Sequence, residues 1–195
     1  MAATDRQRQL DELAQDILEK EVCADLRAQA TQLVMGEGNA FADIVFIGEA
    51  PGKKEDIEGK PFIGAAGKFL NVMLEQAGMD RSDVYITNIV KYRPPNNRDP
   101  LPAEKAAFLP YLLRQLAIIQ PKVVITLGRH SMEYFVPGAK IGDVHGVAVN
   151  VVIDNHEFMV MPLYHPAAAL YNGGLRQTLI DDFLKVPDLV KTLSA

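Results

Sequence analysis

The stretch "ADIVFIGEAPGKKEDIEGKPFIGAAGKFL", residues 42–70, joins a short apolar segment to a loop rich in glycine, proline and charged residues. The apolar segment "ADIVFI" has no helical period and is bounded by turn-forming residues, so it is predicted to be a buried strand. After the loop, "AAGKFLNVMLEQAGM" places apolar side chains at helical spacing and ends near Gly78, which indicates a helix. A strand, a flexible loop and a helix in this order are typical of α/β proteins.

The same alternation continues along the chain. Strands are predicted in "DVYITNIV" (83–90) and "KVVITLG" (122–128), and "GVAVNVVIDNHEFMVMPLYHP" (146–166) has the pattern of two strands joined at "DNHE". Helices are expected near residues 5–20, 23–34, 102–119, 129–136 and 175–193, the last interrupted at Pro187. Because the strands are apolar and β-branched, we expect a three-layer α/β/α sandwich around a central, mostly parallel four-stranded sheet. The chain, 1–195, is expected to form a single domain on which a helical segment, 1–34, packs.

Composition places the chain among ordinary globular proteins, with 195 residues, 48% hydrophobic and 23% charged. It contains no apolar run long enough to span a membrane, and its charged, amphipathic start lacks the apolar core of a signal peptide. A single cysteine, Cys23, excludes an internal disulfide and fits a cytoplasmic protein. The net charge of −5 disfavours non-specific binding to nucleic acid but is compatible with a local basic surface.

The strand ends predict where the functional site lies, because ligands bind beyond the carboxyl ends of parallel strands. Four of the predicted strands end in "GEAPG", "TNIVKYRPP", "LGRHS" and "YHPAAAL". A Walker P-loop is not expected, since no Lys-Ser/Thr pair follows the glycines. The histidines also lack metal-ligand spacing, and no serine nucleophile elbow is present.

Four side chains in these loops can each be interpreted as having either a functional or a purely structural role. Glu49 either positions water and stabilises a cation or caps nearby N–H groups. Phe62 either stacks on a planar ligand or plugs the core. Asn88 either reads the edge of a base or forms a turn, and His165 either donates to a developing oxyanion or is merely hydrogen-bonded in place. Their order along the chain is more informative than any one of them.

Four motifs together resemble the uracil-DNA glycosylase superfamily, most closely its family 4 group of bacteria and archaea. They are "GEAPGKKEDIEGKPFIGAAGKFL" (48–70), "YITNIVKYRPPNNRDP" (85–100), "IQPKVVITLG" (119–128) and "LYHPAAAL" (163–170). The resemblance covers roughly residues 20–190. It implies a small α/β/α domain that hydrolyses the N-glycosidic bond between uracil and deoxyribose during base-excision repair, after flipping the base out of the helix.

The resemblance also implies roles for individual residues. Glu49 would be the catalytic carboxylate and His165 the donor to the leaving uracil. Phe62 would stack on the base, and Asn88 would read its polar edge and exclude cytosine. Backbone N–H groups in the segment Ala50, Pro51 and Gly52 would help to hold the base or a flanking phosphate.

DNA contact is expected from basic residues in the same loops. The residues expected to contact DNA are Lys91, Arg93, Arg98, Arg129 and Leu170, with Lys53, Lys54 and Lys60 nearby. The family usually has a bulky apolar wedge after the "HPA" motif, where this chain has Ala169 and then Leu170. A weakened wedge favours single-stranded substrate, which needs less unstacking. The expected partner is uracil-containing DNA, single- or double-stranded, bound by a monomer.

One departure from the family concerns iron. Family 4 members typically carry four cysteines that ligate a [4Fe–4S] cluster, and alignment on "GEGN" places Glu21, Ala24, Tyr92 and Phe108 at those positions. A cubane cluster needs four ligands, so no cluster and no other metal is expected here. Tyr92 and Phe108 are expected to fill the vacated volume.

Two alternatives to a cluster-free uracil-DNA glycosylase stay open at this point. One is a related glycosylase with shifted base specificity. The other is a non-catalytic protein that binds nucleic acid or a nucleobase.

Overall fold

The computed structural model describes residues 2–194, and at its centre lies one six-stranded sheet in the order β1-β3-β2-β4-β6-β5. The strands are β1 (Glu37–Gly38), β2 (Ile44–Gly48), β3 (Tyr85–Asn88), β4 (Val123–Leu127), β5 (Val149–Ile153) and β6 (His156–Leu163). The inner four, β3, β2, β4 and β6, run parallel, whereas β1 and β5 are antiparallel to their neighbours. The expected four-stranded parallel sheet is therefore the centre of a wider, mixed sheet.

The two edge strands explain the difference in strand count. The pairing of β5 with β6 follows the predicted hairpin at "DNHE", with Ile153 opposite His156. β1 has two residues, and no periodicity can reveal so short a strand. Its pairing with β3 extends the sheet on the side of the N-terminal segment.

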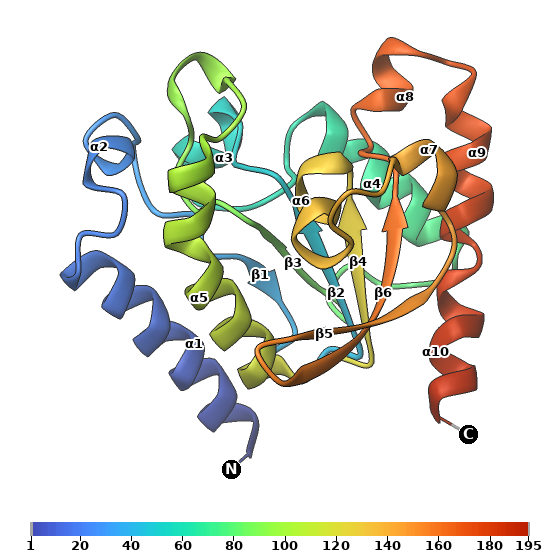
Figure 1. Cartoon of the computed structure of the whole chain (residues 1–195), viewed down its shortest axis with the longest axis horizontal. Coiled ribbons are helices and arrows are strands. Elements are labelled where there is room, and N and C mark those ends of the chain that lie inside the picture. Colours follow the sequence, from blue (N-terminus) through green and yellow to red (C-terminus); the bar gives the residue numbers. More distant parts are fainter. Residues whose placement is uncertain (1, 195) are drawn as a thin grey trace.

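Helices cover both faces of the sheet (Figure 1). They are α1 (Ala2–Glu19), α2 (Ala24–Arg27), α3 (Lys53–Glu58), α4 (Ala65–Gln76), α5 (Pro102–Ile119), α6 (Arg129–Phe135), α7 (Ile141–Val144), α8 (Ala168–Tyr171), α9 (Leu175–Phe183) and α10 (Val186–Ser194). Apolar side chains of α1 and α5 pack on one face, and those of α4 and α9 pack on the other. Among the described residues, no helix is both long and apolar enough to cross a membrane.

Local sequence explains where several elements begin and end. Pro187 stands in the first turn of α10 and separates it from α9, as predicted, because a proline has no N–H to donate within a helix. The expected helix near 23–34 is shorter and is limited to α2. Part of the expected loop 48–68 is instead the helix α3, which ends at Gly59 in a left-handed conformation.

The carboxyl ends of the four parallel strands meet at one edge of the sheet, toward the top of Figure 1. Glu49, Asn88, Gly128 and His165 lie at or just beyond these ends. Residues that are far apart in the sequence are thus brought together by backbone pairing alone, and the loops that follow the strands surround a common space.

Candidate active site

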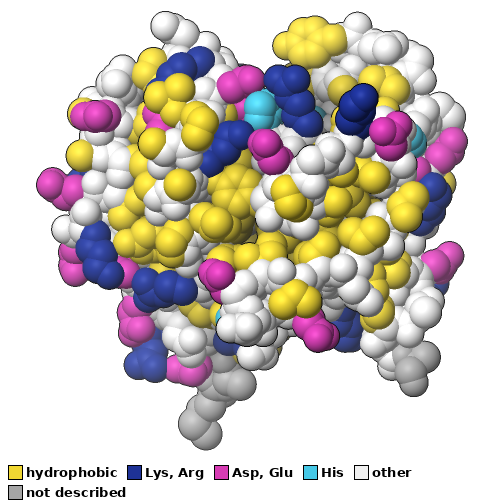
Figure 2. All heavy atoms as spheres, viewed as in Figure 1, with side chains coloured by type: hydrophobic (Ala, Val, Ile, Leu, Met, Phe, Trp, Pro, Cys, Tyr) yellow, Lys and Arg dark blue, Asp and Glu magenta, His cyan; other side chains and the backbone are white. Residues whose placement is uncertain are grey.

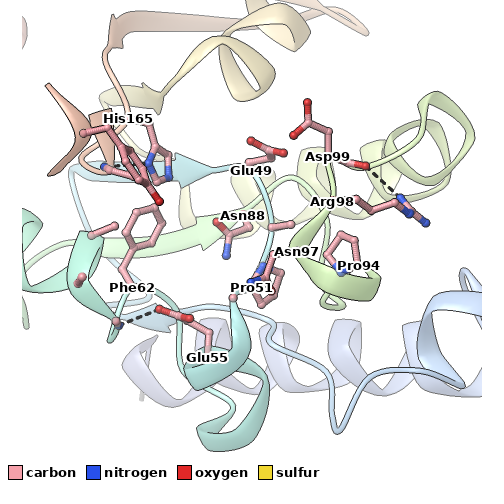
Figure 3. A pocket seen from close by; sticks show the side chains of 17 residues that line it. Glu49, Pro51, Glu55, Phe62, Asn88, Pro94, Asn97, Arg98, Asp99 and His165 are labelled. Carbon is pink, nitrogen blue, oxygen red and sulfur yellow. Dashed lines mark hydrogen bonds between the residues drawn. The ribbon is translucent and has the colours of Figure 1, made fainter. Parts of the chain in front are cut away.

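A pocket of about 500 Å³ opens at this edge of the sheet. All seven residues predicted to bind or react with a base line it, namely Glu49, Ala50, Pro51, Gly52, Phe62, Asn88 and His165. Figure 3 shows that Phe62, Asn88, Glu49 and His165 face one shared space, although they come from four different segments. The spatial convergence expected from the strand ends is confirmed.

Glu49 lies directly after β2, and its side chain is 28% exposed. Burial, and to a smaller extent the neighbouring Asp99 carboxylate, raise the pKa of Glu49 to about 6. Lys105 and Arg129 act in the opposite direction. A carboxylate with a pKa close to neutral is well matched to accept a proton from water in a transition state.

His130 and Asp99 adjoin this carboxylate. The His130 Nε2 atom is 3.2 Å from Asp99 Oδ2 and 3.8 Å from Glu49 Oε2. Burial and the Lys105 ammonium lower the pKa of His130, so the imidazole is neutral at pH 7. The arrangement therefore surrounds Glu49 with one anion, one neutral ring and nearby cations.

The same three side chains bring three potential metal-ligand atoms within 4.8 Å of one another. Arg129 already contacts Asp99 at 3.3 Å and the His130 ring at 3.1 Å, and Lys105 lies 3.4 Å from the other ring nitrogen. A metal ion would have to compete with two cationic side chains for these atoms. The side chains of Glu49, Asp99 and His130 are therefore better suited to proton transfer at Glu49 than to binding a metal ion.

His165 follows β6 after one intervening residue. Its Nδ1 atom accepts a hydrogen bond from the Ala167 N–H at 3.1 Å, so in the neutral ring the proton is on Nε2. Burial lowers the pKa of His165 to about 4. The ring is therefore a neutral donor at pH 7, able to hydrogen-bond an oxygen in the pocket on which negative charge develops.

Phe62 forms an aromatic wall of the pocket, with its ring centroid 5.6 Å from that of His165. It is 6% exposed and has a φ of 52°, a conformation that bulky residues rarely adopt. A Cβ atom at Gly48 would lie 2.5 Å from the Phe62 ring and 2.4 Å from Asn88 Oδ1. Glycine at position 48 is therefore required for these two side chains to approach the strand end.

Two further carboxylates of this loop, those of Glu55 and Asp56, have structural roles. Glu55 accepts hydrogen bonds from the N–H groups of Ile63 and Gly64, at 3.1 and 2.8 Å, and so fixes the turn that carries Phe62. Asp56 is buried and accepts from the backbone and hydroxyl of Thr31. Of the three acids, Glu49 is the one whose carboxylate is left to act in the pocket.

The prediction that Lys91 contacts DNA is wrong. Its side chain is 0% exposed and hydrogen-bonds Thr87, Asn88 and Gln115 in the interior. The clustering of charges in the sequence does not reveal that the Lys91 side chain turns inward, whereas the side chains of Arg93 and Arg98 do not.

The remaining residues predicted to contact DNA lie on or near the surface. Arg98 lines the pocket but pairs with Glu104 through two hydrogen bonds of 2.9 and 2.6 Å. The side chain of Arg129 is 71% exposed, Arg93 donates to Asn97, and Leu170 is 48% exposed on α8. Figure 2 shows basic and acidic side chains interspersed around the hollow at the top of the molecule in this view.

Lys53, Lys54 and Lys60 also lie outside the interior. Lys53 and Lys54 are exposed on α3, whereas Lys60 lies 3.1 Å from Glu37. The charge of Lys60 is thus partly balanced within the chain.

Sequence reasoning missed two features of the pocket. Tyr171 lines it and is 91% exposed, one residue beyond Leu170 on the same short helix. Asp99 belongs to the proline-rich loop "KYRPPNNRDP", for which the sequence predicts DNA contacts by the basic residues alone. The position of Tyr171 directly after the predicted wedge Leu170 could have drawn attention to it. The contact between Asp99 and His130 depends on the fold and has no signal in the sequence.

The four residues at the positions where family 4 proteins carry cysteine ligands do not form a site for an iron–sulfur cluster. Tyr92 and Phe108 are buried, with ring centroids 5.9 Å apart in an edge-to-face arrangement, and Glu21 and Ala24 are exposed. Cys23 is partly buried, and its Sγ atom lies 3.9 Å from the Glu104 carbonyl oxygen. Burial raises the pKa of this thiol to about 11, so it is protonated at pH 7. These residues do not fit a [4Fe–4S] group.

The sequence of the chain is similar to those of known proteins. The family model described as the uracil DNA glycosylase superfamily matches residues 35–186. The type-4 uracil-DNA glycosylase of Saccharolobus solfataricus is 50% identical over 165 residues, which cover 82% of this chain and 76% of that protein. Those of Archaeoglobus fulgidus and Thermotoga maritima are 44% and 40% identical over 185 residues, covering 92% and 94% of this chain and 92% and 96% of theirs.

Proposed function

The chain belongs to the uracil DNA glycosylase superfamily, and we propose that it is an enzyme that hydrolyses the N-glycosidic bond between uracil and deoxyribose in DNA. The observation that carries this proposal is the meeting of Glu49, Phe62, Asn88 and His165 around one pocket of about 500 Å³. A carboxylate, an aromatic wall, an amide and a neutral histidine are the groups that recognition and release of one pyrimidine require.

Binding begins with a base that has left the DNA stack, at a cost of a few kcal/mol when the base starts in a duplex. The pyrimidine ring lies against Phe62, where stacking contributes about 1–3 kcal/mol. The Asn88 amide donates to O4 and accepts from N3–H of uracil. Cytosine has a donor and an acceptor at these two positions in the opposite order, so a fixed amide excludes it.

In the chemical step the C1′–N1 bond breaks and its electron pair stays with the pyrimidine. The Nε2–H group of His165 donates to the pyrimidine oxygen on which the negative charge develops. A water oxygen bonds to C1′, and its proton passes to the Glu49 carboxylate, which also stabilises the positive charge on the sugar. The released pyrimidine anion then takes a proton from solvent.

The proposed enzyme works without an iron–sulfur cluster. The chain has one cysteine, and a [4Fe–4S] cluster is held by four thiolates. Tyr92 and Phe108 are fully buried where two of the ligands would stand. Their packing supports the proposal that aromatic contacts join the N-terminal segment to the 91–108 segment in place of iron.

Arg93, Arg98, Arg129 and Leu170 are the proposed DNA contacts, since they lie around the same edge of the sheet. Both arginines would have to exchange a carboxylate for a phosphate, Arg98 that of Glu104 at 2.6 Å and Arg129 that of Asp99 at 3.3 Å. Arg129 is the more available of the two, because its side chain is 71% exposed. The proposed partner is uracil-containing DNA, single- or double-stranded, bound by a monomer that acts in base-excision repair in the cytoplasm.

The proposal is tested by single-turnover release of uracil from single- and double-stranded oligonucleotides, with hypoxanthine and xanthine substrates as controls. Alkali-sensitive cleavage of the uracil strands alone is the expected result. Cleavage of the control strands in preference to uracil would mean a shifted base specificity. Binding of uracil-containing DNA without any cleavage would mean a non-catalytic protein and would contradict the proposal.

A further inference from the structure

Lys91 has an unusual environment for a lysine. Its side chain is 0% exposed, and its Nζ atom donates to Thr87 Oγ1 at 2.5 Å, Gln115 Oε1 at 2.7 Å and the Asn88 carbonyl oxygen at 2.9 Å. An ammonium group has three N–H donors, whereas a neutral amine has two. Three acceptors around Nζ therefore match the charged form of the side chain.

The acceptors are fixed by bonds of their own. The Thr87 hydroxyl donates to the Met35 carbonyl at 2.8 Å, so its lone pairs face Lys91. The Gln115 amide nitrogen donates to the Met35 carbonyl and to the Tyr85 hydroxyl, both at 3.1 Å, which turns its oxygen toward Nζ. The network is thus oriented to receive a cation.

This cation has no carboxylate within ion-pair distance among residues 2–194. The groups that reach it from β3, α5 and the segment before β1 are hydroxyl, amide and carbonyl groups, and the nearby titratable group is the Tyr85 phenol. Burial lowers the pKa of Lys91 to about 7. A buried charge without a counter-ion is destabilising, so the fold maintains it against a free-energy penalty.

Asn88 connects this cation to the pocket. Its carbonyl oxygen accepts from Lys91, and its side chain lines the pocket beside Phe62 (Figure 3). In the proposed reaction the electron pair of the broken C1′–N1 bond makes the pyrimidine anionic at this place. The Lys91 ammonium donates to the backbone of a residue in the pocket wall, where its positive charge complements that anion in addition to the His165 N–H.

We propose that Lys91 is a positioning residue that holds Asn88 and whose buried positive charge stabilises the negative charge on the departing pyrimidine. This inference rests on the proposed function. Lys91 transfers no proton and does not touch the substrate. The experiments are run at pH 6, below the pKa of about 7 of Lys91, so that it is an ammonium while the pyrimidine carries the electron pair. Its effect is an electric field in a region of low dielectric constant, where one charge acts over several ångströms.

The test compares two leaving groups in single-turnover experiments. Fluorine at C5 stabilises the pyrimidine anion, so 5-fluorouracil depends less on an external positive charge than uracil does. Lys91→Met removes the charge and keeps the length of the side chain. We expect it to slow uracil release about 10-fold and 5-fluorouracil release about 3-fold.

Thr87→Val, compared with the wild type at pH 6, is the matched control, because it removes one acceptor of the network at a pH below the pKa of about 7 of Lys91, where the charge is kept. It is expected to slow release of both bases by the same factor. Lys91→Gln keeps two N–H donors for the same acceptors, and it replaces Lys91→Met if that variant fails to fold.

The outcomes separate this inference from the proposed function. Wild-type release of uracil, together with equal losses for both bases in the folded Lys91 variant, would overturn the role of the charge alone. Failure of the wild-type protein to release uracil would overturn the proposed function and this inference together. A larger loss for uracil than for 5-fluorouracil, seen with Lys91 variants and not with Thr87→Val, is the supporting result.

Discussion

The pocket and the aromatic contact between Tyr92 and Phe108 are both joined to the 91–108 segment, yet they are held together in different ways. The pocket residues Glu49, Asn88 and His165 stand at or near the ends of paired parallel strands, so the backbone ladder of the sheet positions them. Tyr92 and Phe108 are positioned by side-chain packing against the N-terminal segment.

The two regions therefore depend on different parts of the molecule. None of residues 21–24 lines the pocket. The N-terminal segment is held by apolar contacts and by a few hydrogen bonds, such as that from the Val34 N–H to the Lys91 carbonyl at 2.9 Å and those from Thr31 to Asp56. Substitutions in the pocket should therefore change the rate, and substitutions in the aromatic contact should change stability.

Glu49→Gln is expected to have the largest effect on the rate, a loss of about 10³-fold, because the amide cannot accept a proton from water. Its effect on stability should have the opposite sign. The folded-state pKa of Glu49 is raised to about 6, so Glu49 lowers stability as pH rises from about 4.5 through 6. Above pH 6 the variant should unfold at the same or a higher temperature than the wild type. Single-turnover rates and thermal melts at pH 7.5 measure both.

His165→Ala is expected to lower the rate by about 10²–10³-fold, as the loss of one donor to a developing oxyanion does. The neutral state of the ring predicts that the wild-type rate shows no titration of His165 between pH 5 and 9, since its pKa is lowered to about 4. A pH–rate profile of the wild type, compared with the rate of the variant, checks both points. A loss of less than threefold would remove His165 from the mechanism.

Phe108→Ala tests the other region. Removal of a buried aromatic ring should lower the free energy of unfolding by about 3 kcal/mol. Hydrogen exchange should show lost protection first in residues 20–30 and 91–108, while the rate per folded molecule stays within about threefold of the wild type.

Phe183→Ala is the matched control for that experiment, because Phe183 is equally buried on the opposite face of the sheet, stacked on Phe46. It should lower stability by a similar amount without selective loss of protection in residues 20–30. Uniform loss of protection in the Phe108 variant would contradict the separation of the two regions.

Asp99→Asn is expected to have the smallest effect. The Asp99 carboxylate contributes to the raised pKa of Glu49, so its removal should move the acidic limb of the pH–rate profile to lower pH. At pH 5 the variant should then retain about threefold more of its plateau rate than the wild type. Lys105→Met should move the limb in the opposite direction, since Lys105 lowers the same pKa. Shifts in the same direction would contradict this account.

The sequence could predict the pocket because its key residues are attached to strand ends, which local patterns reveal. The segments "ADIVFIGEA" and "YITN" mark both the strands and the polar residues that follow them. Such patterns cannot reveal the two-residue strand β1 or the short helix α3, because neither has a full apolar face.

The sequence also does not show which side chains of the loop after β3 point into the interior. Lys91 and Arg93 are two positions apart in one loop, yet Lys91 is 0% exposed and Arg93 remains at the surface. The acceptors of Lys91 belong to Thr87, Asn88 and Gln115, and only the fold brings Gln115 next to the other two. The His130–Asp99 contact beside Glu49 has the same origin.

The proposed release of uracil without iron can be checked in a single experiment. Protein is prepared with and without iron and sulfide, iron is quantified in each sample, and the single-turnover rate of uracil release is measured on the same samples. We expect iron far below one atom per chain and the same rate in both preparations. A rate that rises in proportion to bound iron, and falls when the iron is removed, would contradict it.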